Sequence, residues 1–79
     1  MNREITMKQY ARHAFRDARG FGMSMAEENS LDGVICCAII DIENGHGEKP
    51  YRDYIEECAH GQRKMSAADY TSWMREGIE

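Results

Sequence analysis

Hydrophobic residues recur along most of this chain at the spacing of an amphipathic α-helix. From Met7 to Ala18 the apolar side chains fall at i, i+3, i+4, i+7, i+8 and i+11, which places them on one helical face. Three further segments show a similar periodicity and end at an asparagine or a glycine. The pattern predicts an all-α bundle of four helices, at about residues 7–19, 31–44, 50–60 and 67–76.

The central segment contains a continuous apolar run from Val34 to Ile40. Seven residues are too few to span a membrane, so we expect a buried element with the others packed around it. Ser30 as an N-cap and Asn44 as a stop signal favour a helix. The β-branched residues leave a strand over 34–40, and hence an α+β fold, as the alternative. A short extra helix near 25–29 either stands alone or merges with the central helix.

Local signals also predict where the other helices begin. Thr6, followed three residues later by Gln9, has the spacing of a capping box and predicts the start of the first helix. Pro50 suits the first turn of a helix, where its missing N–H costs nothing. Ser66 is the expected cap of the last helix.

Seventy-nine residues predict one small helical domain over residues 1–79. A domain of this size is only marginally stable, which raises the expectation of a homodimer or a bound partner. Three cysteines do not form a disulfide framework, so we interpret them as reduced thiols. With no signal peptide or membrane-spanning segment in the sequence, the expected location is the cytoplasm.

Charge is distributed unevenly along the chain. The formal net charge is +3 over residues 1–20, −7 over 21–60 and zero over 61–79. The acidic middle segment could complement the basic first helix, or it could face a protein partner with a basic surface. As candidate partner-binding residues we take all its carboxylates, namely Glu27, Glu28, Asp32, Asp41, Glu43, Glu48, Asp53, Glu56 and Glu57.

A DNA-binding regulator is the alternative function. Residues 51–77 form a helix, a short turn and a helix, and loosely resemble the helix-turn-helix of phage-repressor-type proteins. The candidate DNA contacts are Arg63, Lys64 and Arg75. Phosphate binding needs several cations on one face, and here acidic residues surround these three. Direct nucleic-acid binding is therefore the less favoured interpretation.

The sequence gives little support for a metal site or an enzymatic activity. Cys58 and His60 are separated by one residue, whereas zinc ligands are typically two to five residues apart, so we expect no metal site. The cysteines lie within apolar runs, where a thiol is a poor nucleophile. No phosphate-binding loop or catalytic triad is present, so neither a cofactor nor an enzymatic activity is expected.

In size, acidity and lack of catalytic motifs the chain is similar to small phage-encoded inhibitors of the anti-CRISPR and anti-restriction type. No motif carries this resemblance, so no functional residue is transferred from it. The resemblance implies a non-enzymatic protein that blocks a nucleic-acid-binding complex by presenting an acidic surface. The sequence therefore leaves two hypotheses, an acidic inhibitor or adaptor and a helix-turn-helix regulator.

Overall fold

The protein folds into four helices. The structure, a computed structural model, describes the backbone of residues 3–20 and 22–78. The helices are α1 (Arg3–Arg19), α2 (Met25–Glu43), α3 (Lys49–Ala59) and α4 (Ala67–Ile78). The described residues contain no strand, so the all-α prediction is confirmed and the strand alternative for 34–40 is wrong.

The central helix is longer than its predicted span. Ser24 caps it, since its Oγ accepts a hydrogen bond from the backbone N–H of Glu27 at 3.2 Å. The helix then continues through Ser30 without a break, so residues 25–29 merge with the central helix and form no separate one. It ends where predicted, at Asn44, and the following Gly45 takes a φ of 97° that favours glycine.

The predicted start of the first helix is wrong. The helix already includes Arg3, so Thr6 lies inside it and does not cap it. A cap is worth only about 1 kcal/mol, and no glycine or proline stops the helix from extending upstream of Thr6. Ser66 does cap α4, because its Oγ accepts from the Asp69 N–H at 3.1 Å. This last helix runs two residues past its predicted end, to Ile78.

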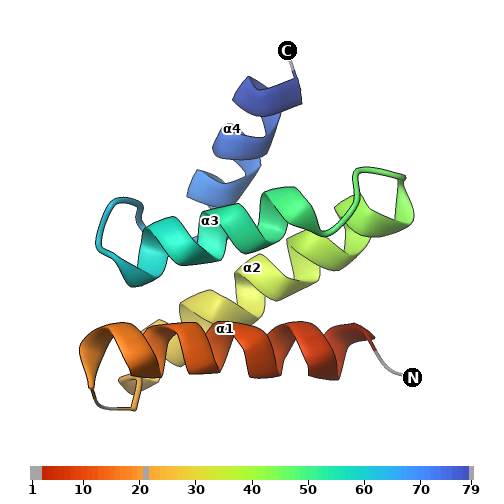
Figure 1. Cartoon of the computed structure of the whole chain (residues 1–79). Helices are drawn as coiled ribbons and strands as arrows, with labels where there is room; N and C mark the ends of the chain where they lie inside the picture. The colour runs from red at the N-terminus through yellow and green to blue at the C-terminus, as the bar shows by residue number, and fades with distance from the viewer. Residues whose placement is uncertain (1–2, 21, 79) are drawn as a thin grey trace.

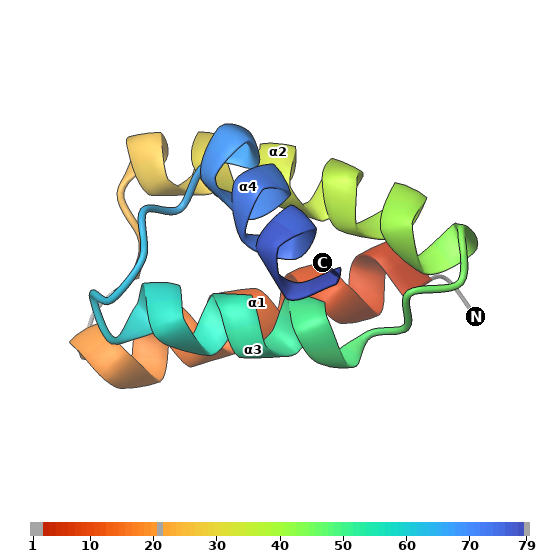
Figure 2. The ribbon, with the colours of Figure 1, turned by 90° about the horizontal axis from the view of Figure 1, so that it is seen from above.

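The helices pack as a ring around one core. α1 contacts α2 and α3 on one side, and α4 contacts the same two helices on the other side. α1 and α3 run in the same direction and α2 runs opposite to them (Figure 1). Seen from above, α4 crosses between α2 and α3, with α1 beneath (Figure 2).

The core contains most of the apolar positions that the helical periodicity selects, although Tyr10 and Ala14 are only half-buried and Ala18 is exposed. Its buried members are Met7, Ala11, Phe15, Leu31, Val34, Ile35, Ala38, Ile42, Tyr51, Tyr54, Ile55, Cys58, Ala59, Tyr70 and Met74. Each helix contributes to this cluster, and the small size of the domain leaves room for only one such core.

Candidate functional site

The acidic residues at the start of α2 lie along the seam with α1. Lys8 Nζ is 3.3 Å from an Asp32 carboxylate oxygen, and Arg12 is 4.0 Å from Glu28. All four side chains are between a third and about half exposed. Exposed ion pairs of this kind contribute about 0–1 kcal/mol each. These two ion pairs place opposite charges along the contact between α1 and α2, but the carboxylates of Asp32 and Glu28 remain accessible to solvent.

The solvent side of α2 is both acidic and apolar. Met25 is 79% exposed and Ile40 is 58% exposed, although Ile40 belongs to the apolar run that the sequence predicts to be buried. Cys36, one turn before Ile40, is exposed as well. Glu43 is exposed at the end of the same helix, and α2 contains no lysine or arginine. Met25 and Ile40 are 15 residues apart on the helix, so they are two separate exposed apolar groups beside carboxylates and not one continuous patch.

The other two candidate carboxylates of α2 are less accessible. Asp41 is half-buried and faces α4. There it adds to the effect of burial in raising the pKa of Tyr70 above its ordinary value. Glu27 is also half-buried, near the loop between α3 and α4. These two residues contribute less to a surface that a large partner could reach.

The acidic residues of and beside α3 are paired with neighbouring basic residues, three of which are lysine or arginine and one of which is a histidine. The pairs are Glu48–Arg52 at 3.5 Å, Asp53–Lys49 at 2.6 Å, Glu56–His60 at 3.8 Å and Glu57–Arg63 at 3.4 Å. Tyr10 of α1 joins this network, since its hydroxyl donates to Glu56 and the Arg52 guanidinium lies 4.3 Å from its ring centroid. Burial, and then the hydrogen bond to Glu56, raise the pKa of Tyr10 to about 12.

The structure therefore divides the predicted acidic surface in two. Lys8, which meets α2, and Tyr10, which meets α3, are about 200° apart around α1. The α2 carboxylates and Glu56 consequently lie on opposite flanks of α1. The sequence does not show that the α2 carboxylates and Glu56 lie apart, because their separation depends on how α1 is oriented between α2 and α3.

The candidate DNA contacts do not form one exposed basic face. Arg63 lies between two carboxylates, with its Nε 3.4 Å from Glu57 and its Nη1 3.9 Å from Asp69. Lys64 is exposed in the same loop, whereas Arg75 is in the last turn of α4. A phosphate approaching Arg63 would meet both neighbouring carboxylates, which weakens the regulator hypothesis.

Sequence reasoning placed Tyr54 in the core but missed the role of its hydroxyl. The ring is fully buried, and the hydroxyl lies 2.9 Å from a carboxylate oxygen of Asp69 and hydrogen-bonds to the carbonyl of Lys64. Burial, followed by the Asp69 hydrogen bond, raises the Tyr54 pKa well above its ordinary value. This residue ties the loop between α3 and α4 to α3, so its role is structural.

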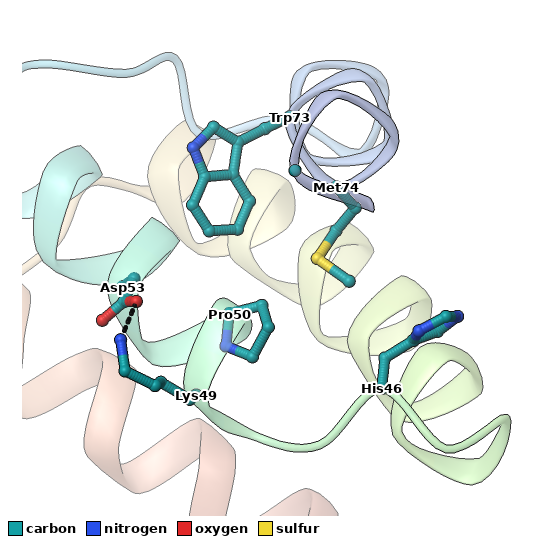
Figure 3. A pocket seen from close by; sticks show the side chains of 7 residues that line it. His46, Lys49, Pro50, Asp53, Trp73 and Met74 are labelled. Atoms are coloured by element: carbon teal, nitrogen blue, oxygen red, sulfur yellow. Dashed lines mark hydrogen bonds and ion pairs between the residues drawn. The ribbon is translucent and has the colours of Figure 1, made fainter. Parts of the chain in front are cut away.

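A pocket of about 250 Å³ opens between the start of α3 and the second half of α4 (Figure 3). Trp73 and Met74 extend from α4 toward Pro50, and they form an apolar centre. The Lys49–Asp53 ion pair lies at one end and His46 at the other. The full lining is His46, Lys49, Pro50, Asp53, Trp73, Met74 and Gly77. In the sequence, only the i, i+4 spacing of Lys49 and Asp53 indicates a part of this site, namely their ion pair. The pocket itself forms where α4 crosses α3, and the sequence does not show that crossing.

The cysteines differ in accessibility, which predicts a difference in reactivity. Burial raises the pKa of the Cys58 thiol to about 11, whereas Cys36 is exposed on α2. We expect Cys36 to react rapidly with Ellman's reagent in the native protein and Cys58 to react only on unfolding. Cys36→Ser should remove the fast phase and Cys58→Ser should leave it unchanged. Equal native rates at both positions would contradict the buried environment of Cys58.

Neither a metal centre nor a membrane-spanning helix is found in the part of the chain that the structure describes. No group of three or more histidine, cysteine or carboxylate side chains lies close enough there to hold an ion. None of the described helices combines the length and the hydropathy needed to cross a membrane. Comparison of the chain with protein-family models, curated proteins and solved structures finds no match.

Proposed function

We propose that this protein is a non-enzymatic binding module, an acidic inhibitor or adaptor of a nucleic-acid-binding complex, and that the outer side of α2 contacts the partner. The observation that carries the proposal is the combination of exposed Met25 and Ile40 with exposed carboxylates on a helix that lacks basic residues. A basic partner surface would gain charge complementarity from Asp32 and Glu43 and apolar contact from Ile40. Nucleic acid itself would be repelled by the same carboxylates.

The acidic residues of α3 support this function less well than Glu43 of α2, and the same holds for Asp32, whose carboxylate lies 3.3 Å from Lys8. Each of them already faces a basic residue of its own chain, for example Asp53 with Lys49 at 2.6 Å and Glu57 with Arg63 at 3.4 Å. A partner would have to displace these cations before it could use the carboxylates. Among the residues that the structure describes, no ion pair involves the exposed Glu43, so we assign the partner contact to α2.

A tagged pull-down from a nuclease-treated lysate tests the proposal. The native protein should retain a complex that mass spectrometry identifies as nucleic-acid-binding. The variant Asp32→Lys/Glu43→Lys should retain at least about tenfold less, because like charges then face each other across the interface. The control is Asp17→Lys/Glu76→Lys, which alters exposed positions on other helices. Both variants bring the formal net charge from −4 to zero, so only the location of the charge differs.

Two outcomes would overturn the proposal. Equal capture by the native protein and the α2 variant would exclude an acidic contact through α2. Failure to capture a complex, together with duplex DNA binding that weakens steeply with salt, would instead favour the regulator hypothesis through Arg63, Lys64 and Arg75. Circular dichroism of both double variants establishes that each retains its helices.

A further inference from the structure

The pocket between α3 and α4 combines an apolar centre with one ion pair, whose opposite charges cancel. Trp73 is half-buried and Met74 is almost fully buried, and both face Pro50 across the opening (Figure 3). These three side chains provide a surface that an aromatic or aliphatic group can cover. A volume of about 250 Å³ lies just below the range of ordinary ligand pockets, so it suits a single ring-sized group.

The charges at one end of the pocket determine which polar group fits there. Lys49 Nζ and an Asp53 carboxylate oxygen are 2.6 Å apart, and their side chains are 85% and 47% exposed. A ligand with a single carboxylate would satisfy Lys49 but be repelled by Asp53, and an amine would have the opposite problem. A ligand that carries both an ammonium and a carboxylate can replace this one ion pair by two, so that neither Lys49 nor Asp53 is left without an opposite charge.

We propose that this pocket binds a free amino acid with an apolar side chain. The side chain covers Trp73 and Pro50, the α-ammonium group pairs with Asp53, and the α-carboxylate pairs with Lys49. Lys49 is the first residue of α3, where the helix dipole also favours a carboxylate. This inference concerns a site separate from the outer side of α2, so it stands or fails independently of the proposed partner contact.

Trp73 is the single tryptophan of the chain, so its fluorescence reports directly on the pocket. The probes are L-phenylalanine, hydrocinnamate, which lacks the ammonium group, and phenethylamine, which lacks the carboxylate. We expect a saturable change in Trp73 emission with L-phenylalanine, with a dissociation constant on the order of millimolar. Each singly charged analogue should bind about two- to fivefold more weakly, as the loss of one exposed ion pair predicts.

Two pocket variants separate the roles of the charges. In Lys49→Gln, L-phenylalanine should lose its advantage over phenethylamine, because nothing then pairs with the carboxylate. In Asp53→Asn, it should lose its advantage over hydrocinnamate. The control Lys64→Gln removes an exposed lysine outside the lining of this pocket and should leave all three affinities unchanged.

The proposal is overturned by any of three results. These are the absence of a saturable emission change with L-phenylalanine, equal affinity for all three probes, and unchanged preferences in both pocket variants. The last two results would show that the pocket accepts an apolar ring without recognising the amino-acid group.

Discussion

Replacing Leu31 with alanine is expected to remove about 2–5 kcal/mol from the free energy of unfolding. Leu31 is fully buried in the middle of the four-helix core, so the truncation loses apolar burial and leaves a cavity. The total stability of a domain of 79 residues is about 4–12 kcal/mol. The variant should therefore show a much lower urea midpoint, measured by circular dichroism, or be largely unfolded in water.

The matched control for this substitution is Ile40→Ala on the same helix. Ile40 is 58% exposed, so we expect its truncation to change stability by no more than about 0.5 kcal/mol. Alanine also has the higher helix propensity, which offsets part of any loss. A large loss at Ile40 that depends on protein concentration would show that a second copy covers this side of α2. A loss below about 1 kcal/mol at Leu31 would contradict the assigned core.

The helical faces could be predicted from sequence because a packed helix buries positions that recur every 3.6 residues. Met7, Ala11, Val34 and Ile55 are all buried where the apolar pattern places them. Within the central helix the pattern was less informative, since apolar residues surround most of its circumference. The pattern therefore predicts that Ile40 is as buried as its neighbours, whereas it faces solvent.

The limits of the helices were predicted less well than their faces. Ser66 caps a helix as predicted, whereas Thr6 and Ser30, the other two predicted caps, both lie inside helices, and the cap of α2 is Ser24. A cap contributes about 1 kcal/mol, which is similar to the effect of adding a few favourable helical residues. The stretch upstream of Thr6 is compatible with a helix, so the helix extends to Arg3.

The arrangement of candidate site residues depends on contacts between distant parts of the chain. His46 and Trp73 line one pocket because α4 crosses the start of α3. Asp32 and Glu56 lie on opposite flanks of α1, although both belong to the same acidic segment of the sequence. Neither fact has a signature in local spacing, because crossing angles between helices depend on side-chain packing along their whole contact.

Replacing Tyr54 with phenylalanine is expected to cost about 1–3 kcal/mol of stability. The ring itself is retained, and with it the edge-to-face contact with Tyr70, whose centroid lies 5.1 Å away. The loss comes from the hydroxyl, which bonds to Asp69 and to the carbonyl of Lys64 in a partly buried environment. Without it, the Asp69 carboxylate and the Lys64 carbonyl lose the one proton that they share, and the loop between α3 and α4 loses one of its attachments. Urea unfolding measures the stability, and amide hydrogen exchange should show faster exchange in this loop.

Tyr51→Phe provides the comparison, because Tyr51 is equally buried on the same helix. Its hydroxyl donates only to the carbonyl of Met7, at 3.1 Å, and Met7 lies within α1, where that carbonyl can also accept from its own helix. We therefore expect a smaller loss, about 0.5–1.5 kcal/mol. A double-mutant cycle between Tyr54→Phe and Asp69→Ala should give a coupling energy of about 0.5–3 kcal/mol. A coupling energy near zero would mean that the hydrogen bond to Asp69 does not stabilise the protein, and that the hydroxyl acts only through the carbonyl of Lys64.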